Sequence, residues 1–106
     1  MLKICDLEVD LDERRVSRAG QEIALAPREF QLLELLVRHR GRAVGSVLIW
    51  QHFYGDLTDY EPNRIPTYVR ALRHKIDKGF DRPLLLTRWG SGYLLQDDGQ
   101  PGNAEA

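Results

Sequence analysis

The chain has 106 residues, which is enough for one compact domain with a single hydrophobic core and too few for a second. Because 42% of the residues are hydrophobic, 29% are charged and only 5 are proline, the composition excludes collagen-like, disordered and disulfide-scaffold proteins. The net charge of −1 is unevenly distributed, since residues 63–90 hold 7 Lys and Arg against 2 Asp and Glu, while residues 1–62 hold 8 against 11 and residues 91–106 hold 0 against 3.

Apolar and polar residues mostly alternate between Leu2 and Leu25, which predicts several short antiparallel strands. The turn-forming pairs Asp12-Glu13 and Ala19-Gly20 separate these runs. A sheet this short with one apolar face needs a covering element. The next segment supplies it, because Pro27 at a first-turn position and Gly41 as a C-cap predict a helix over residues 27–40.

A second, shorter helix is predicted over residues 47–54, with Ser46 as its N-cap and Gly55 as its C-cap. The segment is very apolar, so we expect it to be mostly buried. Its aromatic residues Trp50, Phe53 and Tyr54 lie at helical spacing, and such residues in a short apolar helix are far more often core than the lining of a ligand pocket.

A third helix follows the polar loop 55–62, with Asn63 as N-cap, Pro66 in the first turn and an end near Lys78. At about 100° per residue its apolar residues fall within one narrow arc, formed by Ile65, Val69, Leu72 and Ile76. The opposite side is polar and cationic and holds Asn63, Thr67, Arg70, Ala71, His74 and Lys78. One face of the helix therefore packs and the other faces outward.

Two strand-like runs, residues 84–87 and 92–95, are joined by Arg88-Trp89-Gly90-Ser91. This pattern predicts a hairpin that displays Arg88 and Trp89 at its tip. Residues 96–106 contain no aliphatic side chain larger than alanine, and we expect them to form a disordered tail.

A helix with a cationic free face, followed by a basic hairpin, is the arrangement that places a helix in the major groove of DNA with a β-ribbon beside it. Arg and Lys favour this placement because they replace the counterions condensed on the phosphates. The alternative interpretation is that the cationic stripe is simply the solvated face of an amphipathic helix. Charge and periodicity alone leave both interpretations open.

The sequence resembles the OmpR/PhoB-type winged-helix effector domain of bacterial two-component response regulators. The resemblance extends from about Leu7 to Leu95, and the matching segments are 7–11, 15–20, 25–33, 63–76 and 87–93. Each segment alone is weakly diagnostic, whereas the ordered set at these spacings is highly specific.

The resemblance implies an α+β fold of the winged helix-turn-helix type. One domain over residues 1–95 would comprise an N-terminal antiparallel four-stranded sheet (2–25), a three-helix core (27–78) and a C-terminal β-hairpin wing (84–95). The recognition helix 63–78 would enter the major groove and the wing 88–91 would reach the minor groove. The residues expected to contact DNA are Asn63, Arg64, Thr67, Tyr68, Arg70, Ala71, Arg73, His74, Lys75, Lys78, Arg88 and Trp89.

The implied function is that of a sequence-specific DNA-binding transcriptional regulator, the effector domain of a response regulator without its receiver domain. The resemblance also implies binding to promoter direct repeats as a head-to-tail dimer, and contact with RNA polymerase through the 55–62 loop. The alternative function is that of a winged helix acting mainly as a protein-protein interaction module. We expect no enzymatic activity, because the chain has no nucleophile elbow, phosphate loop or carboxylate constellation.

Four residues depart from the pattern of the family. Ala26 stands where a Thr N-cap is usual, which removes a cap worth about 1 kcal/mol and is expected to leave Glu29 without its capping partner. Pro66 and Ala71 replace an acidic and a basic residue in the recognition helix, and Trp89 replaces an arginine in the wing. These three changes bear on base specificity and on the minor-groove contact.

We expect no metal, cofactor, small-molecule ligand or membrane contact. His39, His52 and His74 fall on three separate segments without ligand spacing. The single cysteine, Cys5, favours a reducing compartment. No run approaches the roughly 18 apolar residues of a membrane span, and residues 1–25 carry charges where a signal peptide needs an apolar run. A cytoplasmic location is therefore predicted.

Overall fold

A computed structural model describes residues 1–96 of the chain. Four strands, β1 (Leu2–Ile4), β2 (Leu7–Asp10), β3 (Arg15–Arg18) and β4 (Gln21–Ile23), precede α1 (Pro27–Arg38) and α2 (Ser46–Tyr54). A 3₁₀ turn, η1 (Pro62–Arg64), leads into α3 (Ile65–Ile76), which is followed by β5 (Leu85–Arg88) and β6 (Gly92–Leu95). The predicted α+β architecture of a four-stranded antiparallel sheet, three helices and a C-terminal hairpin is confirmed. Of the predicted tail 96–106, residues 97–106 lie outside the described part.

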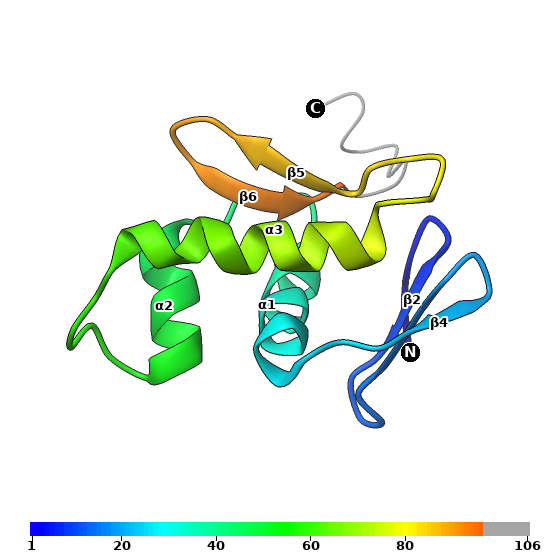
Figure 1. Ribbon diagram of the computed structural model, residues 1–106, viewed down its shortest axis with the longest axis horizontal. Coiled ribbons are helices and arrows are strands. Elements are labelled where there is room, and N and C mark those ends of the chain that lie inside the picture. The colour runs from blue at the N-terminus through cyan, green and yellow to red at the C-terminus, as the bar shows by residue number, and fades with distance from the viewer. Residues whose placement is uncertain (97–106) are drawn as a thin grey trace.

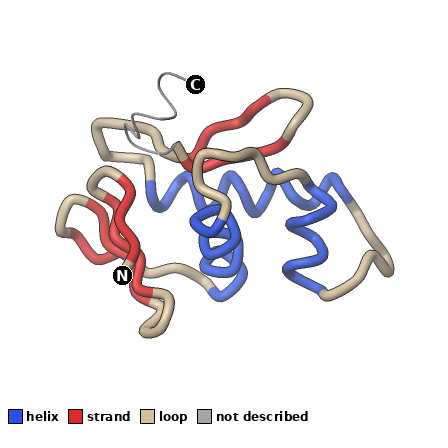
Figure 2. Tube along the Cα trace, turned by 180° about the vertical axis from the view of Figure 1, so that it is seen from behind, coloured by secondary structure: helices blue, strands red, loops and turns tan. Residues whose placement is uncertain are grey.

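The elements form three groups around α3, which crosses the molecule (Figure 1). The β5–β6 hairpin lies along one side of α3, α1 and α2 pack on another, and the N-terminal sheet lies at the C-terminal end of the helix. Figure 2 shows from behind that the sheet and the loop between α2 and α3 are at opposite ends of the molecule. Within residues 1–96, no helix combines the length and the apolar character needed to cross a membrane.

The hydrophobic core is centred on α1. Leu32, Leu33 and Leu36 are fully buried there, and they join the apolar arc predicted for α3, whose four residues are all buried. On the sheet side the core takes up the inward-facing residues of β2 and β3. The registers Val9↔Val16 and Leu7↔Arg18 place Arg18 on this inner face, next to three apolar side chains.

Helix α1 begins where predicted but ends at Arg38, two residues early, with His39 as its C-cap. The expectation that Glu29 has no capping partner is wrong. Its carboxylate accepts the backbone N–H of Ala26 at 2.8 Å, although Ala26 offers no side-chain acceptor in return. One half of the capping arrangement therefore forms without the other.

Helix α2 differs from its prediction at its start and in its burial. It begins at Ser46, with Gly45 as the N-cap, so Ser46 is the first helical residue rather than the cap. Only Ile49, Trp50 and Phe53 are buried, and the remaining hydrophobic side chains, Val47, Leu48 and Tyr54, are exposed. The expectation of a mostly buried helix is wrong because α2 packs through one edge and its outer side meets solvent.

Helix α3 is shorter than the predicted span 63–78. Asn63 lies within the 3₁₀ turn and does not cap the helix, because the residue at the N-cap position of α3 is Arg64. The helix ends at Ile76, and Lys78 follows it in a turn that contains Gly79 at φ +89°. The face assignment is unaffected, since the four predicted core residues are those that are buried.

The hairpin is anchored to the connection between α1 and α2. Val44 forms an isolated bridge with Tyr93, in which the two backbones exchange hydrogen bonds of 2.7 and 3.0 Å. Gly92 has φ +130°, and a Cβ at this position would stand 2.2 Å from the carbonyl oxygen of Val44. Only glycine fits this close crossing, which fixes the start of β6, next to the hairpin turn, against the segment between α1 and α2.

Candidate nucleic-acid interface

The outer face of α3 presents a row of polar and cationic side chains to solvent. Thr67, Arg70 and His74 are exposed along it, and Lys78 continues the row just beyond the helix end. Ala71 lies between them and is half-buried. Within residues 1–96, neither Arg70 nor Lys78 forms an ion pair with an acidic side chain. Their charges are therefore available to an external anion.

Two of the predicted contact residues lie instead on the flank of α3 that faces the other helices. The hydroxyl of Tyr68 is 3.1 Å from that of Tyr54 in α2, and its ring packs edge-on against Phe53. The hydrogen bond with Tyr68 raises the pKa of Tyr54 above its ordinary value of 10.0. Tyr68 thus contributes to the junction between α2 and α3.

Lys75 lies on this same flank, two turns further along the helix. Its Nζ is 2.7 Å from Oε1 of Glu29, the carboxylate that also accepts the N–H of Ala26. The lysine charge is thus neutralised inside the domain, in a pair whose acidic partner is almost buried. No local sequence pattern indicates this pair, because its members lie 46 positions apart in the chain.

Arg73 lies on the opposite flank, as predicted, where it contacts the hairpin. Its Nε donates to the carbonyl oxygen of Leu85 at 3.0 Å and its Nη2 to Oγ1 of Thr87 at 3.0 Å. The guanidinium thereby ties α3 to β5. Together with Arg70, His74 and Lys78 it lines one shallow hollow that faces outward.

The hairpin tip is the second exposed cationic feature. Arg88 is exposed, and Trp89 is 91% exposed, the most open of the large hydrophobic side chains in the described residues. A hydrogen bond from Ser91 N–H to the carbonyl oxygen of Arg88 at 3.0 Å closes the turn, with Gly90 at φ +86°. Such an exposed indole next to a guanidinium is typical of a surface that becomes covered on binding.

The first two predicted contact residues, Asn63 and Arg64, are both exposed on the 3₁₀ turn that precedes α3. Arg64 reaches toward the α2 end of the molecule, where its guanidinium lies 3.5 Å from Glu61 and 6.0 Å from the ring centroid of Trp50. The structure therefore leaves one row of side chains exposed along α3 and a second exposed site, Arg88 and Trp89, at the hairpin tip; the row is formed by Thr67, Arg70, His74 and Lys78. It assigns Tyr68, Arg73 and Lys75 to contacts inside the domain.

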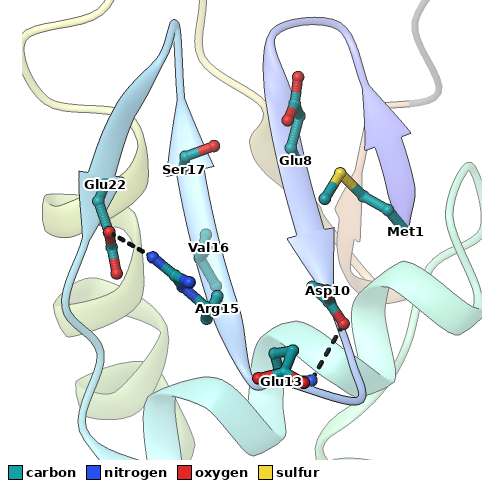
Figure 3. Close-up of a pocket in the computed structure, with 8 residues that line it drawn as sticks. All are labelled: Met1, Glu8, Asp10, Glu13, Arg15, Val16, Ser17 and Glu22. Atoms are coloured by element: carbon teal, nitrogen blue, oxygen red, sulfur yellow. Dashed lines mark hydrogen bonds and ion pairs between the residues drawn. The ribbon is translucent and has the colours of Figure 1, made fainter.

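The outer face of the N-terminal sheet has the opposite charge. Figure 3 shows a shallow hollow there, lined by four acidic residues, Glu8, Asp10, Glu13 and Glu22, and by Arg15. Arg15 pairs with Glu22 at 3.1 Å, which raises the pKa of the guanidinium, and Lys3 pairs with Glu8 at 3.9 Å, so two of the four acids have no ion pair within residues 1–96. The sheet is thus acidic outside, at the end of the molecule away from the loop between α2 and α3.

Arg18 is 0% exposed and does not belong to the residues predicted from the sequence. Its inward place in the alternation of β3 was the available signal, because a charged residue at a core-facing position requires buried partners. Within residues 1–96, no group of three or more His, Cys, Asp and Glu side chains is placed to hold a metal ion.

The family model described as "Transcriptional regulatory protein, C terminal" matches residues 20–95. The transcriptional regulatory protein CusR of Escherichia coli K12 is 40% identical over 99 residues, which cover 92% of this chain and 44% of CusR. The probable transcriptional regulatory protein SilR of Salmonella typhimurium is 39% identical over 100 residues, covering 90% of this chain and 42% of SilR. The chain therefore spans less than half the length of these curated relatives.

Solved structures of similar fold cover nearly the whole described chain. The DNA-binding domain of CpxR from Escherichia coli matches with a TM-score of 0.75 and 31% identity, over 91% of this chain and 95% of that one. The DNA-binding domain of RstA from Klebsiella pneumoniae, in complex with the RstA box, matches with a TM-score of 0.80 over 91% and 96% of the two chains. At 23% identity this second likeness concerns the fold.

Proposed function

Because the chain belongs to the family of C-terminal domains of transcriptional regulatory proteins, we propose that it binds double-stranded DNA, with α3 in the major groove and the β5–β6 hairpin at the adjacent minor groove. The family consists of regulators and not of enzymes. The observation that carries the proposal is the contrast on α3, where Arg70 and Lys78 have no acidic partner within residues 1–96 while Lys75 is neutralised by Glu29. Exposed cations on a helix of groove-fitting size supply the phosphate contacts that DNA binding requires.

Within this proposal the exposed side chains have separate roles. Thr67, Arg70 and Ala71 face the base edges, where Ala71 offers only an apolar contact such as one with a thymine methyl group. Lys78 and Asn63, at the two ends of the row, lie where phosphates pass. At the hairpin, Arg88 enters the minor groove and Trp89 packs on the sugar-phosphate edge.

Salt-dependent binding tests the proposal. A duplex recovered from a randomised pool by selection with the protein is labelled, and its affinity is measured by fluorescence anisotropy between 50 and 200 mM salt, the range over which phosphate contacts dominate. Lys78→Ala, which removes a proposed phosphate contact, should weaken binding and reduce the slope of log K against log salt by about one. Lys75→Ala is the matched control in the same basic segment and should leave the slope unchanged. A wild-type affinity that does not change with salt would contradict the proposal.

We further propose that two copies bind direct repeats head to tail, in the cytoplasm. The acidic outer face of the sheet on one copy would meet the wing side of the next copy, whose segment 63–90 is basic, a pairing of favourable sign. Successive copies must follow the helical repeat, so half-sites should lie about 10 base pairs apart. Inserting five base pairs turns the second site to the opposite side of the duplex and should abolish cooperative binding. Cooperativity that survives the insertion would contradict tandem binding.

A protein-facing role is favoured by one specific observation. Val47, Leu48 and Leu57 are 45%, 41% and 42% exposed, and they lie on α2 and on the loop 55–62 that follows it. We propose that this surface contacts RNA polymerase while α3 and the hairpin hold DNA. Val47→Ser combined with Leu48→Ser should lower transcription from a reporter promoter without changing DNA affinity. Equal losses in both assays would contradict a separate protein contact.

A further inference from the structure

The buried guanidinium of Arg18 joins three parts of the molecule that are far apart in sequence. Its Nε donates to Oδ1 of Asp6 at 2.8 Å, and its Nη1 donates to the carbonyl oxygen of Ile76 at 2.6 Å and to Oδ1 of Asp77 at 2.8 Å. Its Nη2 donates to the carbonyl oxygen of Arg82. A side chain of the N-terminal sheet thus reaches both the end of α3 and the segment that leads into β5.

The bond to Ile76 completes the C-terminal end of α3. The last four carbonyl groups of a helix have no partner within the helix, and a cation near them also interacts favourably with the helix dipole. The guanidinium provides both a hydrogen bond and a positive charge. Its Cζ lies 5.0 Å from the ring centroid of Phe80 in the following turn. Arg18 therefore holds the position at which α3 stops.

Asp77 connects the buried guanidinium of Arg18 to the hairpin. Besides pairing with Arg18, its carboxylate accepts the N–H of Leu84 at 2.9 Å and that of Leu85 at 3.0 Å, the residues where the chain enters β5. The side chain of Asp77 is only 8% exposed, so without the guanidinium it would be a buried carboxylate with no countercharge. The position of the β5 entry thus depends on Arg18 through Asp77.

We infer that Arg18 is a positioning residue for DNA binding, which sets the hairpin relative to α3 so that both meet one duplex together. The inference rests on the proposed function. The planar fork of an arginine suits this position, because it holds four acceptors in fixed directions, whereas a lysine ammonium has three donors and no fixed plane. The side chain itself is buried and does not touch DNA.

Arg18 could stabilise the fold without positioning the hairpin, and a double-mutant cycle distinguishes a stabilising role from a positioning role. If Arg18 only stabilises the fold, then a folded Arg18 variant binds DNA through α3 and the hairpin as before. If Arg18 positions the hairpin, the contribution of Arg88 at the tip disappears when Arg18 is changed, while the contribution of Arg70 on α3 persists.

The experiment uses the full chain and the selected duplex, with Arg88→Ala and Arg70→Ala each introduced into wild type and into Arg18→Lys and Arg18→Met. We expect each Arg18 change to weaken binding about tenfold, and Arg88→Ala to cost no further affinity in these backgrounds. Arg70→Ala should lose the same factor in all three. Asp6→Asn is the matched control, because it removes the partner that lies away from α3 and should preserve the cost of Arg88→Ala. An undiminished cost of Arg88→Ala in both Arg18 variants would overturn the inference.

Amide hydrogen exchange gives a second readout that does not need DNA. Arg18→Lys, which keeps the positive charge and is the variant more certain to fold, should accelerate exchange at Leu84 and Leu85 at least tenfold more than at Leu33 in the core of α1. Equal acceleration at the three sites would overturn the positioning role in favour of general destabilisation. If the wild type fails to bind any duplex, the proposed function fails, and the exchange pattern still decides whether Arg18 fixes the β5 entry.

Discussion

The cationic side chains of α3 have different partners on the outer face of the helix and on its two flanks. Arg70 and Lys78 on the outer face reach solvent, whereas Lys75 on one flank lies 2.7 Å from Glu29 and Arg73 on the other donates two hydrogen bonds to β5. All four belong to the same basic segment. The number of positive charges on a helix therefore overstates its binding surface, because part of the charge is paired with groups of the same domain.

The largest effect is expected when Asp77 loses its contacts with Arg18 and with the start of β5. Asp77→Ala removes the acceptor of two backbone N–H groups and leaves the buried Arg18 short of a countercharge. Breaking a buried pair from one side costs about 3 kcal/mol or more, and we expect the free energy of unfolding to fall by that amount in urea titrations. Asp81→Ala, at an exposed site in the same loop, is the control and should change stability by less than about 0.5 kcal/mol. Similar losses in both variants would mean that the loop sequence, rather than the Asp77 contacts, sets stability.

The base preference of the outer face should change when a cation is added in the middle of its row of exposed side chains. Ala71→Arg should favour guanine at one position of the selected sequence, since a good bidentate contact is worth about 1–3 kcal/mol of discrimination. Sequencing of duplexes selected from a randomised pool measures this change. An identical preferred sequence for both proteins would remove position 71 from the base-facing surface.

A somewhat smaller effect is expected at the hairpin tip, which extends the outer face toward the minor groove. Arg88→Ala should weaken binding to a site with an A·T-rich flank by about 1 kcal/mol more than to the same site with a G·C-rich flank, because narrow minor grooves attract arginine. Competition binding with the two duplexes gives the difference directly. Equal losses would reduce Arg88 to a phosphate contact without preference.

Replacing Lys75 and Lys78 in turn compares a flank of α3 with its outer face. Lys75→Met should lower the free energy of unfolding by about 0.5–1 kcal/mol and leave the salt slope of DNA binding unchanged, since its charge is already paired. Lys78→Met should do the reverse, with unchanged stability and a slope reduced by about one. Thermal unfolding and anisotropy titrations on the same samples check both. A reduced slope for Lys75→Met would place that residue on the DNA surface.

The smallest effect concerns acid stability at Asp6. The hydrogen bond from Arg18 holds the pKa of this carboxyl below its ordinary value of 3.8. A lowered pKa in the folded state stabilises the fold above the unfolded pKa, and this contribution is lost as the pH falls through the folded pKa. Asp6→Asn should therefore be less stable than wild type at pH 7 by about 0.5 kcal/mol, because the carboxylate is half exposed, and the gap should close toward pH 2. A difference in unfolding free energy between wild type and Asp6→Asn that does not depend on pH would show that the charge of Asp6 does not contribute to stability.

The elements and the outer face could be predicted from the sequence because each depends on local spacing. The apolar arc of α3, the hairpin at residues 84–95 and the alternation of the N-terminal strands all have periods that can be seen within a few residues. The family resemblance added the order and the topology of these elements. What it could not supply is which cations of α3 remain free.

The parts that were missed depend on partners far away in the chain or on the packing of whole elements. Arg18 and Ile76 are 58 residues apart, and Lys75 and Glu29 are 46 apart, so no local pattern links them. The exposure of Val47 and Leu48 depends on how α2 packs against its neighbours, which composition does not determine. For Arg18, the alternation of β3 did contain a usable signal, since it placed an arginine among inward-facing residues.

The way the hairpin is anchored also bears on how the protein avoids aggregation. A two-stranded ribbon normally exposes two edges of unpaired backbone groups, and such edges recruit strands from other molecules into growing sheets. Here the edge of β6 is occupied by Val44, which exchanges two hydrogen bonds with Tyr93. On β5, the first amide is taken by Asp77 and the carbonyl of Leu85 by Arg73. The contacts that orient the hairpin therefore also occupy backbone groups on both of its edges, which limits the pairing of these edges with strands of other molecules.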